Sequence, residues 1–228
     1  MENLVIIGCS ETAERILFFC ERYKLYNVIG FSVDKQYMKC DTFHGYPVWP
    51  TEELHLHMNI ERDKIFVALF WNHLNGDRRR LFEKFDKLGY SFANIISPNS
   101  SIRGTIGKNC WIMDSVTVQE YATIEDNVII ADMAFIGHKT YIGSHSFVGA
   151  KSTIMGGGRI GAQTFVGIGA TIFDSTVIGE KCIIGACTIV KRNLPSCCSC
   201  RVNNIDNLIK QYTEDVIESK WVAGHNVR

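Results

Sequence analysis

Fifteen aliphatic residues recur at every sixth position, and this period constrains the fold more than any other feature of the sequence. The series starts at Ile106 and ends at Val190, and every member is isoleucine or valine. A period of six does not fit the face of an α-helix, which repeats about every 3.6 residues. It fits short β-strands joined by tight turns, with one aliphatic side chain per strand pointing inward. Hexapeptide repeats of this kind are a signature of parallel β-helices.

Small residues accompany the aliphatic series. A small residue often lies two positions before the aliphatic residue, and glycine often follows it directly. We expect these glycines to permit turn geometry that a β-branched residue would resist. Three hexads form one triangular coil of 18 residues, so the fifteen hexads predict five coils, about 24 Å tall at a strand spacing of about 4.8 Å. Stacked coils would bury the aliphatic column continuously.

A different pattern, in which strands and helices alternate, precedes the repeat. The predicted strands are 3–10, 27–34, 64–70 and 92–97. A helical pattern over 13–23 lies between the first two strands, and another amphipathic helix is predicted over 79–90. This alternation indicates a small parallel α/β sheet. Gly8 follows the first strand, where such sheets bind phosphates. The full G-x-G-x-x-G pattern is missing, however, and a plain tight turn explains Gly8 equally well.

The last segment, 196–228, follows the repeat and forms the third predicted part of the chain. Its apolar residues fall roughly on one face of a helix over 204–222. We expect this helix to pack against the last coil and cover the open edge of the β-helix. The predicted fold is therefore an α/β Rossmann-like N-terminal domain, a parallel β-helix and a C-terminal helix.

The repeat resembles that of the hexapeptide-repeat acyltransferases, and the stretch IIGACTIVKRNLP, 183–195, is similar to the exit from their last coil. The segment Tyr46 to Val48 is similar to their Gly-x-Pro-Val segment. Residues 1–200 together resemble the sialic acid O-acetyltransferase and UDP-4-amino-sugar N-acetyltransferase family. The resemblance implies a nucleotide-sugar-binding domain over 1–97, a left-handed β-helix acetyltransferase domain over 98–195, and a homotrimer.

His138 is the candidate catalytic base. By residue type alone it would be a surface histidine or one packed against a neighbouring subunit. The resemblance implies instead a base in a cleft between subunits, because the family has a histidine at this repeat position. Neutral imidazole can take the proton of an attacking amine or hydroxyl near neutral pH. Adding 18 to 138 gives Gly156, and the family uses a glycine one coil above the histidine to approach the thioester and its oxyanion.

The family usually places an acidic residue directly after the histidine, but this chain has Lys139, which cannot accept a hydrogen bond. One coil below His138 lies Glu120, which either orients the ring or forms a salt bridge to Lys139. Lys139 would otherwise contact a substrate phosphate or carboxylate. His145 either touches the sugar or faces solvent. A zinc site like that of γ-type carbonic anhydrases needs three histidines, and the repeat has two, so no metal is expected.

The resemblance also implies how the ligands are held. Acetyl-CoA, the co-substrate, would lie in a groove near the later coils. The small residues that match the family's positions there are Gly167, Gly169, Gly185 and Ala186, although Gly185 would equally serve a turn alone. Lys191 or Arg192 would meet the CoA phosphates. The nucleotide sugar would contact Gly8 and Asp34, which match the family's positions, whereas Cys9 and Ser10 depart from its glycine-rich turn.

Composition limits the partners and the compartment. The formal net charge is zero, which argues against a nucleic-acid partner. No apolar run approaches the roughly 20 residues of a membrane span, and the N-terminus lacks the pattern of a signal peptide. The nine cysteines are odd in number and scattered, which favours free thiols in the cytoplasm. The SCCSC cluster at 196–200 lacks the paired spacing of a zinc site.

These patterns predict an acetyl-CoA-dependent acetyltransferase. Its acceptor would be an amino or hydroxyl group of a nucleotide-linked or surface-glycan sugar, with His138 as general base. Two alternatives stay open. One is a non-catalytic nucleotide-sugar-binding or scaffold trimer, which Lys139 and the incomplete glycine turn favour. The other is a related acyltransferase with a different acyl donor.

Overall fold

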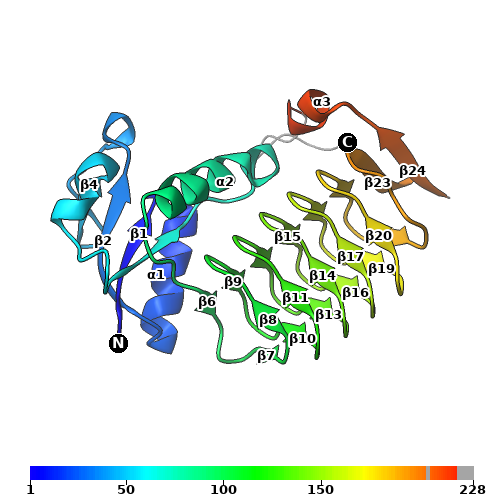
Figure 1. The fold of residues 1–228 in the computed structure, drawn as a ribbon, viewed down its shortest axis with the longest axis horizontal. Coiled ribbons are helices and arrows are strands. Elements are labelled where there is room, and N and C mark those ends of the chain that lie inside the picture. The colour runs from blue at the N-terminus through cyan, green and yellow to red at the C-terminus, as the bar shows by residue number, and fades with distance from the viewer. Residues whose placement is uncertain (204–205, 220–228) are drawn as a thin grey trace. The chain divides into compact units, whose positions relative to one another are not determined.

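The computed structural model describes residues 1–203 and 206–219, which form two compact units. One unit contains Met1–Phe70 and Asp77–Ile95, and the other contains Trp71–Gly76 and the chain from Ile96 onward (Figure 1). Within the described residues, no helix is long and apolar enough to cross a membrane.

A five-stranded sheet of order β3-β4-β2-β1-β5 forms the centre of the first unit. Its strands are β1 (Asn3–Ile7), β2 (Asn27–Val33), β3 (Thr42–Phe43), β4 (Tyr46–Pro50) and β5 (Lys64–Val67). All of its strand pairs are parallel except β3 with β4. Its helical elements are α1 (Glu11–Tyr23), η1 (Lys35–Tyr37), η2 (Thr51–Leu56) and the part of α2 (Asn72–Lys87) from Asp77. The strand order reverses at β1, because β2 lies on one side of it and β5 on the other. Sheets of this kind bind ligands at such a reversal.

Strand β1 is buried on both faces of the sheet, which explains the unbroken apolar run in its sequence. Leu4 to Ile7 are all buried, because a parallel strand inside such a sheet is covered on both faces. The predicted strand 64–70 ends earlier, at Val67. The prediction of one strand over 92–97 is wrong: Phe92 forms a bridge with Ile65, whereas β6 (Ile95–Ile96) joins a sheet of the β-helix. The run spans the boundary between the two units.

Three parallel sheets, built mostly from two-residue strands, form the β-helix of the second unit (Figure 1). Sheet 1 contains β7 (Ser101–Ile102), β10 (Thr117–Val118), β13 (Phe135–Ile136), β16 (Thr153–Ile154), β19 (Thr171–Ile172) and β22 (Ile189–Val190). Sheet 2 contains β8 (Thr105–Ile106), β11 (Thr123–Ile124), β14 (Tyr141–Ile142), β17 (Arg159–Ile160) and β20 (Val177–Ile178). Sheet 3 contains β6, β9 (Trp111–Ile112), β12 (Ile129–Ile130), β15 (Phe147–Val148), β18 (Phe165–Val166), β21 (Ile183–Ile184), β23 (Cys198–Asn203) and β24 (Asp206–Gln211).

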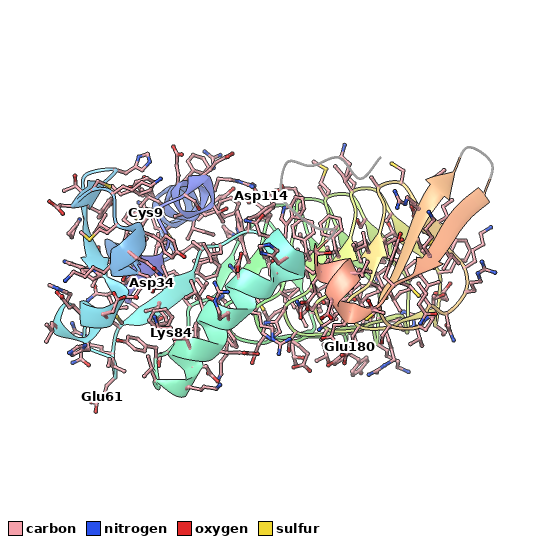
Figure 2. All side chains as sticks on the ribbon, turned by 90° about the horizontal axis from the view of Figure 1, so that it is seen from above. Cys9, Asp34, Glu61, Lys84, Asp114 and Glu180 are labelled. Carbon is pink, nitrogen blue, oxygen red and sulfur yellow. The ribbon has the colours of Figure 1, made fainter. Side chains whose placement is uncertain are left out.

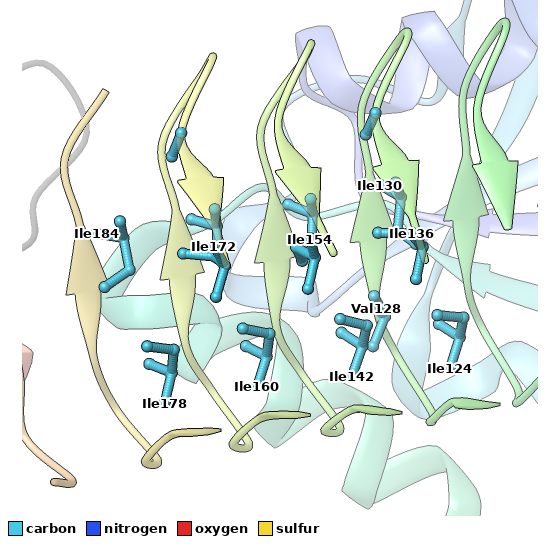
Figure 3. Close-up of a cluster of buried hydrophobic side chains, with 14 of the residues drawn as sticks. Ile124, Val128, Ile130, Ile136, Ile142, Ile154, Ile160, Ile172, Ile178 and Ile184 are labelled. Atoms are coloured by element: carbon cyan, nitrogen blue, oxygen red, sulfur yellow. The ribbon is translucent and has the colours of Figure 1, made fainter. Parts of the chain in front are cut away.

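The strand register confirms the predicted 18-residue coil. Ile136 pairs with Ile154 in sheet 1, Ile142 with Ile160 in sheet 2, and Val148 with Val166 in sheet 3. The second residue of each strand points inward, and these side chains form one continuous buried column (Figure 3). The column starts earlier than predicted, because Ile96 and Ile102 also pack against it.

The glycines after the aliphatic residues have a different cause from the one expected from the sequence. Gly137 and Gly143 are not among the residues with positive φ. The left-handed residue of each corner comes later, as at Lys139 with φ 55° and His145 with φ 64°. A Cβ on Gly143 would lie 2.5 Å from the backbone nitrogen of Ala162 in the next coil. The close approach of successive backbones therefore requires these glycines.

The C-terminal end of sheet 3 is a hairpin. β23 pairs in parallel with β21, and β24 returns antiparallel to β23. The predicted helix over 204–222 is therefore wrong for 206–211, which form β24 because their backbone pairs with β23. Only α3 (Glu214–Ser219) is helical in this range, and 204–205 and 220–222 lie outside the described residues.

Helix α3 packs on the outer face of sheet 3. Its Ile217 is fully buried in a cluster with Leu74 and Ile183. The side chain of Lys181 lies 3.0 Å from the carboxylate of Glu218 and also pairs with Glu214. The hairpin extends sheet 3 beyond β21, and α3 covers part of the outer face of this sheet instead of the open edge at the last coil, where the predicted helix was expected.

Strand β20 offers a matched test of the inward column, because its two residues point to opposite sides. Ile178 is 1% exposed and Val177 is 40% exposed. We expect Ile178→Ala to lower the free energy of unfolding by about 2–5 kcal/mol through loss of buried methyl groups and creation of a cavity. Val177→Ala should cost less than about 1 kcal/mol. Urea denaturation would measure both values, and equal losses would contradict the assigned orientation of the strand.

Candidate active site

His138 lies at the corner that joins sheet 1 to sheet 2, between β13 and β14. The left-handed conformation of Lys139 turns the chain directly after it. Both side chains are exposed. The chain therefore presents the imidazole on the outside of a β-helix corner, as the position of His138 in the repeat predicts.

Gly156 lies directly against the imidazole, one coil further along. A Cβ on Gly156 would lie 2.2 Å from Cε1 of His138, 2.6 Å from Nδ1 and 3.0 Å from Nε2. Any side chain at this position would therefore displace the ring. The N–H of Gly157 also donates to the backbone oxygen of His138 at 2.8 Å. The structure thus brings together the two residues that the 18-residue period placed in register.

The backbone N–H of Gly156 is a candidate oxyanion donor. It donates no hydrogen bond to any residue that the structure describes. The residue that faces this nitrogen from the coil below is Gly137, since a Cβ on Gly137 would lie only 2.6 Å from it. Glycine has no side chain, so Gly137 offers no side-chain acceptor to the Gly156 N–H. One coil lower, Gln119 has such a side chain, and its Oε1 accepts from the N–H of His138 at 3.0 Å. The corner therefore combines an anchored histidine with an unengaged backbone donor, which suits a developing oxyanion.

Glu120 lies one coil below His138, but its carboxylate pairs with a different residue. Its Oε2 is 3.6 Å from Nη1 of Arg103, and both side chains are about half exposed. The N–H of Lys139 donates to the backbone oxygen of Glu120 at 3.1 Å. Among the described residues, the Glu120 carboxylate bonds neither to the His138 ring nor to Lys139. Orientation of the ring by Glu120 therefore stays a prediction.

His145 lies at another corner, between sheets 2 and 3. Its Nδ1 is 2.9 Å from Nδ2 of Asn127, whose Oδ1 accepts from Asn109 at 2.7 Å. Its backbone oxygen accepts from Asn75 Nδ2 at 2.8 Å. Asn109, Asn127 and His145 all have positive φ, so they occupy equivalent left-handed positions in successive coils. This polar ladder is not visible in the sequence without knowledge of the left-handed corner position.

The residues predicted to contact acetyl-CoA lie on both sides of sheet 1. Gly167 and Gly169 follow β18, and Gly185 and Ala186 follow β21, at the corner from sheet 3 to sheet 1. Gly156 and Lys191 lie at the corner where sheet 1 ends. A Cβ on Gly167 would lie 2.5 Å from the nitrogen of Ala186, so these small residues are also needed for coil stacking. The Lys191 Nζ lies 5.2 Å from the ring centroid of Phe173.

Sheet 1 and its corners carry exposed apolar side chains. They are Tyr121, Met133, Ile168, Phe173 and Ile189, which are between 38% and 78% exposed. The outer face of sheet 3 is different, since Trp111, Ile129 and Phe147 are buried there. This surface is not apparent from the sequence, because it depends on which residues of each hexad face outward.

Gly8 and Asp34 follow neighbouring strands of the first unit. Gly8 has a φ of 125°, and its N–H donates to the Ser32 oxygen at 2.7 Å. The backbone conformation alone therefore favours glycine at this position. Asp34 Oδ1 accepts hydrogen bonds from Thr51 Oγ1 and from Lys84 Nζ, the latter at 3.2 Å. Asp34 and Lys84 are labelled in Figure 2. Partial burial tends to raise the pKa of Asp34, but the bonds from Thr51 and Lys84 and the charges of Lys84 and Arg80 outweigh it and lower the pKa.

Two family models of hexapeptide repeats match the β-helix of this chain. The bacterial transferase hexapeptide repeat matches residues 103–138, and the hexapeptide repeat of succinyl-transferase matches residues 159–192. No curated protein sequence matches the chain significantly. The chain is a hexapeptide-repeat protein with an N-terminal α/β sheet and a three-sheet parallel β-helix.

Solved structures share this fold over almost the whole chain. PerB from Caulobacter crescentus, solved with CoA and GDP-perosamine, is 25% identical, with a TM-score of 0.79 over 92% of this chain and 98% of that chain. The acetyltransferase domain of PglB from Neisseria gonorrhoeae, solved with acetyl coenzyme A, is 21% identical, with a TM-score of 0.77 over 92% and 99%. WeeI from Acinetobacter baumannii is 16% identical, with a TM-score of 0.76 over 92% and 100%. The predicted resemblance to the hexapeptide-repeat sugar acetyltransferases is confirmed.

Gln119 offers a test of how the backbone of His138 is held. We expect Gln119→Leu, which removes the acceptor, to speed hydrogen exchange of the His138 amide by about fivefold to tenfold, the effect of one hydrogen bond. Gln119→Glu keeps an acceptor and should leave the exchange rate within about twofold. Amide-resolved NMR would measure both, with the Gly157 amide as internal reference. Unchanged exchange in Gln119→Leu would show that the Gln119 side chain does not anchor His138.

Proposed function

We propose that this protein is an acetyl-CoA-dependent acetyltransferase that acts on an amino or hydroxyl group of a nucleotide-linked or surface-glycan sugar. The observation that carries the proposal is the contact between the His138 ring and Gly156, whose backbone N–H is unengaged within the described chain. PerB, which was solved with CoA and GDP-perosamine, and the PglB domain, which was solved with acetyl coenzyme A, support this class of donor and acceptor.

The proposed reaction needs one base and one donor at the thioester. A ring nitrogen of neutral His138 takes the proton of the acceptor amine or hydroxyl as that group attacks the acetyl carbonyl carbon. The carbonyl oxygen becomes an oxyanion, which accepts a hydrogen bond from the Gly156 N–H. The C–S bond then breaks as the C=O bond re-forms, and CoA leaves as its thiolate. The protonated His138 returns its proton to the thiolate, so the free base is restored.

The donor would lie along sheet 1. Gly167, Gly169, Gly185 and Ala186 leave room for the pantetheine arm, and Lys191 would meet the CoA phosphates. The exposed apolar side chains of sheet 1 and its corners support an assembly in which further copies of the chain cover this face. A homotrimer with the donor in a groove between two copies is the assembly that we propose.

The acceptor contacts that we propose come from four residues. Gly8 and Asp34 would contact its nucleotide, and Lys139 would contact a phosphate or carboxylate. Glu120 would assist His138 if it exchanged its Arg103 partner for the ring. His145 is the weakest of the proposed acceptor contacts, because its ring is part of the polar ladder with Asn127.

The cysteines support a reducing compartment for this activity. All nine are free thiols in the structure. Burial, followed by the charge of Glu21, raises the pKa of Cys20 to about 12, and burial raises the pKa of Cys182 to about 12. Such buried thiols are unreactive and need no pairing. We therefore propose the cytoplasm as the compartment.

Replacement of His138 tests the function directly. We expect His138→Ala to lower kcat/KM for acetyl transfer by about 10²–10⁴-fold, the usual contribution of a general base. Binding of acetyl-CoA, measured by calorimetry, should change little. His55→Ala, which removes an exposed histidine of the first unit, is the matched control and should keep full activity.

The same experiment decides between the enzyme and its alternatives. Acetyl transfer at the full rate in His138→Ala would exclude this residue as the base. If the unmodified protein binds nucleotide sugars but transfers no acetyl group, the scaffold function holds instead. Transfer from a longer acyl-CoA, but not from acetyl-CoA, would point to a different acyl donor.

A further inference from the structure

The carboxylate of Asp34 lies at the carboxyl end of β2, and only one of its two oxygens accepts hydrogen bonds from described residues. Asp34 Oδ1 accepts from Thr51, at the end of β4, and from Lys84, on α2. No described residue donates to its Oδ2. The side chain is 25% exposed, so a ligand can reach this carboxylate.

The two donors fix this carboxylate in one orientation and keep it ionised. Thr51 directly follows β4, and Lys84 comes from the helix that follows β5, so three separate elements meet at Asp34. Partial burial tends to raise the pKa of Asp34, but the hydrogen bonds from Thr51 and Lys84 and the charges of Lys84 and Arg80 lower it overall. An ionised carboxylate held through one oxygen presents the other as a strong acceptor.

The surroundings favour uncharged donors over phosphate at this acceptor. Lys84 is already paired with Asp34, and the N–H of Gly8 is already donated to Ser32. The N-terminus of α1 attracts anions, but the charges of Glu11 and Glu14 in its first turn oppose that attraction. Ribose hydroxyls meet the requirement, because they donate hydrogen bonds and carry no charge. An acidic residue after the second strand of such a sheet is also placed to reach a ribose.

We propose that Thr51 and Lys84 are positioning residues that hold Asp34 so that its Oδ2 accepts hydrogen bonds from the ribose hydroxyls of a nucleoside diphosphate. The inference rests on the proposed function, which supplies a nucleotide-linked acceptor. It adds two residues that the sequence did not single out, and it assigns them a role distinct from contact with the phosphates.

The test compares ribose with dideoxyribose on the full-length protein. The probes are UDP and GDP and their 2′,3′-dideoxy counterparts, with affinities measured by calorimetry. For whichever base binds, we expect the unmodified protein to prefer the ribonucleotide by about tenfold or more, as two hydrogen bonds to a charged acceptor predict. Lys84→Met and Thr51→Val should each weaken the ribonucleotide by about fivefold and leave the dideoxy form unchanged.

The comparison within each variant separates positioning from other roles. Lys87→Met, an exposed lysine on the same helix, is the control and should change neither affinity. Equal weakening of both nucleotides in Lys84→Met would show that Lys84 contacts the phosphates, which overturns the inference. Unchanged affinities in both variants would overturn it as well. Thermal unfolding of each variant checks that the fold is kept, and Thr51→Val tests the idea without a change of charge.

The outcome also distinguishes this inference from the proposed function. If neither UDP nor GDP binds the unmodified protein, the nucleotide-linked acceptor fails together with the inference. If a nucleotide binds without discrimination between ribose and dideoxyribose, the acceptor class stands and only the inference fails.

Discussion

The close stacking of successive backbone coils is the constraint on which the second unit depends. Each coil hydrogen-bonds to the next, and at the corners the backbones approach so closely that only glycine fits at Gly137, Gly143 or Gly149. Burial of the aliphatic column stabilises the stack, and about 25 cal/mol per Å² of apolar area is the scale of that contribution. The hydrogen bonds and the glycines fix the register, so that every side chain has a defined neighbour one coil away.

The candidate site is a direct consequence of this register. The fold itself does not require a particular residue at position 138, because the equivalent corner positions one coil before and two coils after hold Glu120 and Asp174. This chain has a histidine at position 138, and a residue without a side chain above it. Gly156 therefore has two functions in our account: it makes room for the imidazole, and it leaves a backbone donor beside the ring. The coil register places positions 138 and 156 against each other, and histidine and glycine at these positions make the corner a candidate reaction site.

Much of the second unit was predictable from the sequence, because a strict six-residue period determines which residues are neighbours in successive coils. The stacking of Gly156 on His138 followed from the 18-residue coil alone. The partner of Glu120 did not follow, because the first coil is irregular: β10 pairs with β7 at an offset of 16 residues, which brings Arg103 beside Glu120. The polar ladder of His145 was hidden for a related reason, since it depends on the left-handed position of each corner.

The non-repeating segments were harder to predict from local pattern. The stretch 206–211 has an apolar spacing that suits a helix, yet it forms β24 because β23 offers a free edge to pair with. The positions of Thr51 and Lys84 beside Asp34 depend on the order of the strands, and the sequence does not state that order.

Gly156→Ala tests the central claim most directly, and the measurement is the rate of acetyl transfer by this variant. An added methyl group would occupy the space of the His138 ring, where the closest ring atom lies 2.2 Å from the new Cβ. We expect the rate to fall by about 10²-fold or more, the scale of loss when a catalytic group is misplaced by about 1 Å. A variant that folds normally and transfers acetyl groups at the full rate would show that this contact does not form the site.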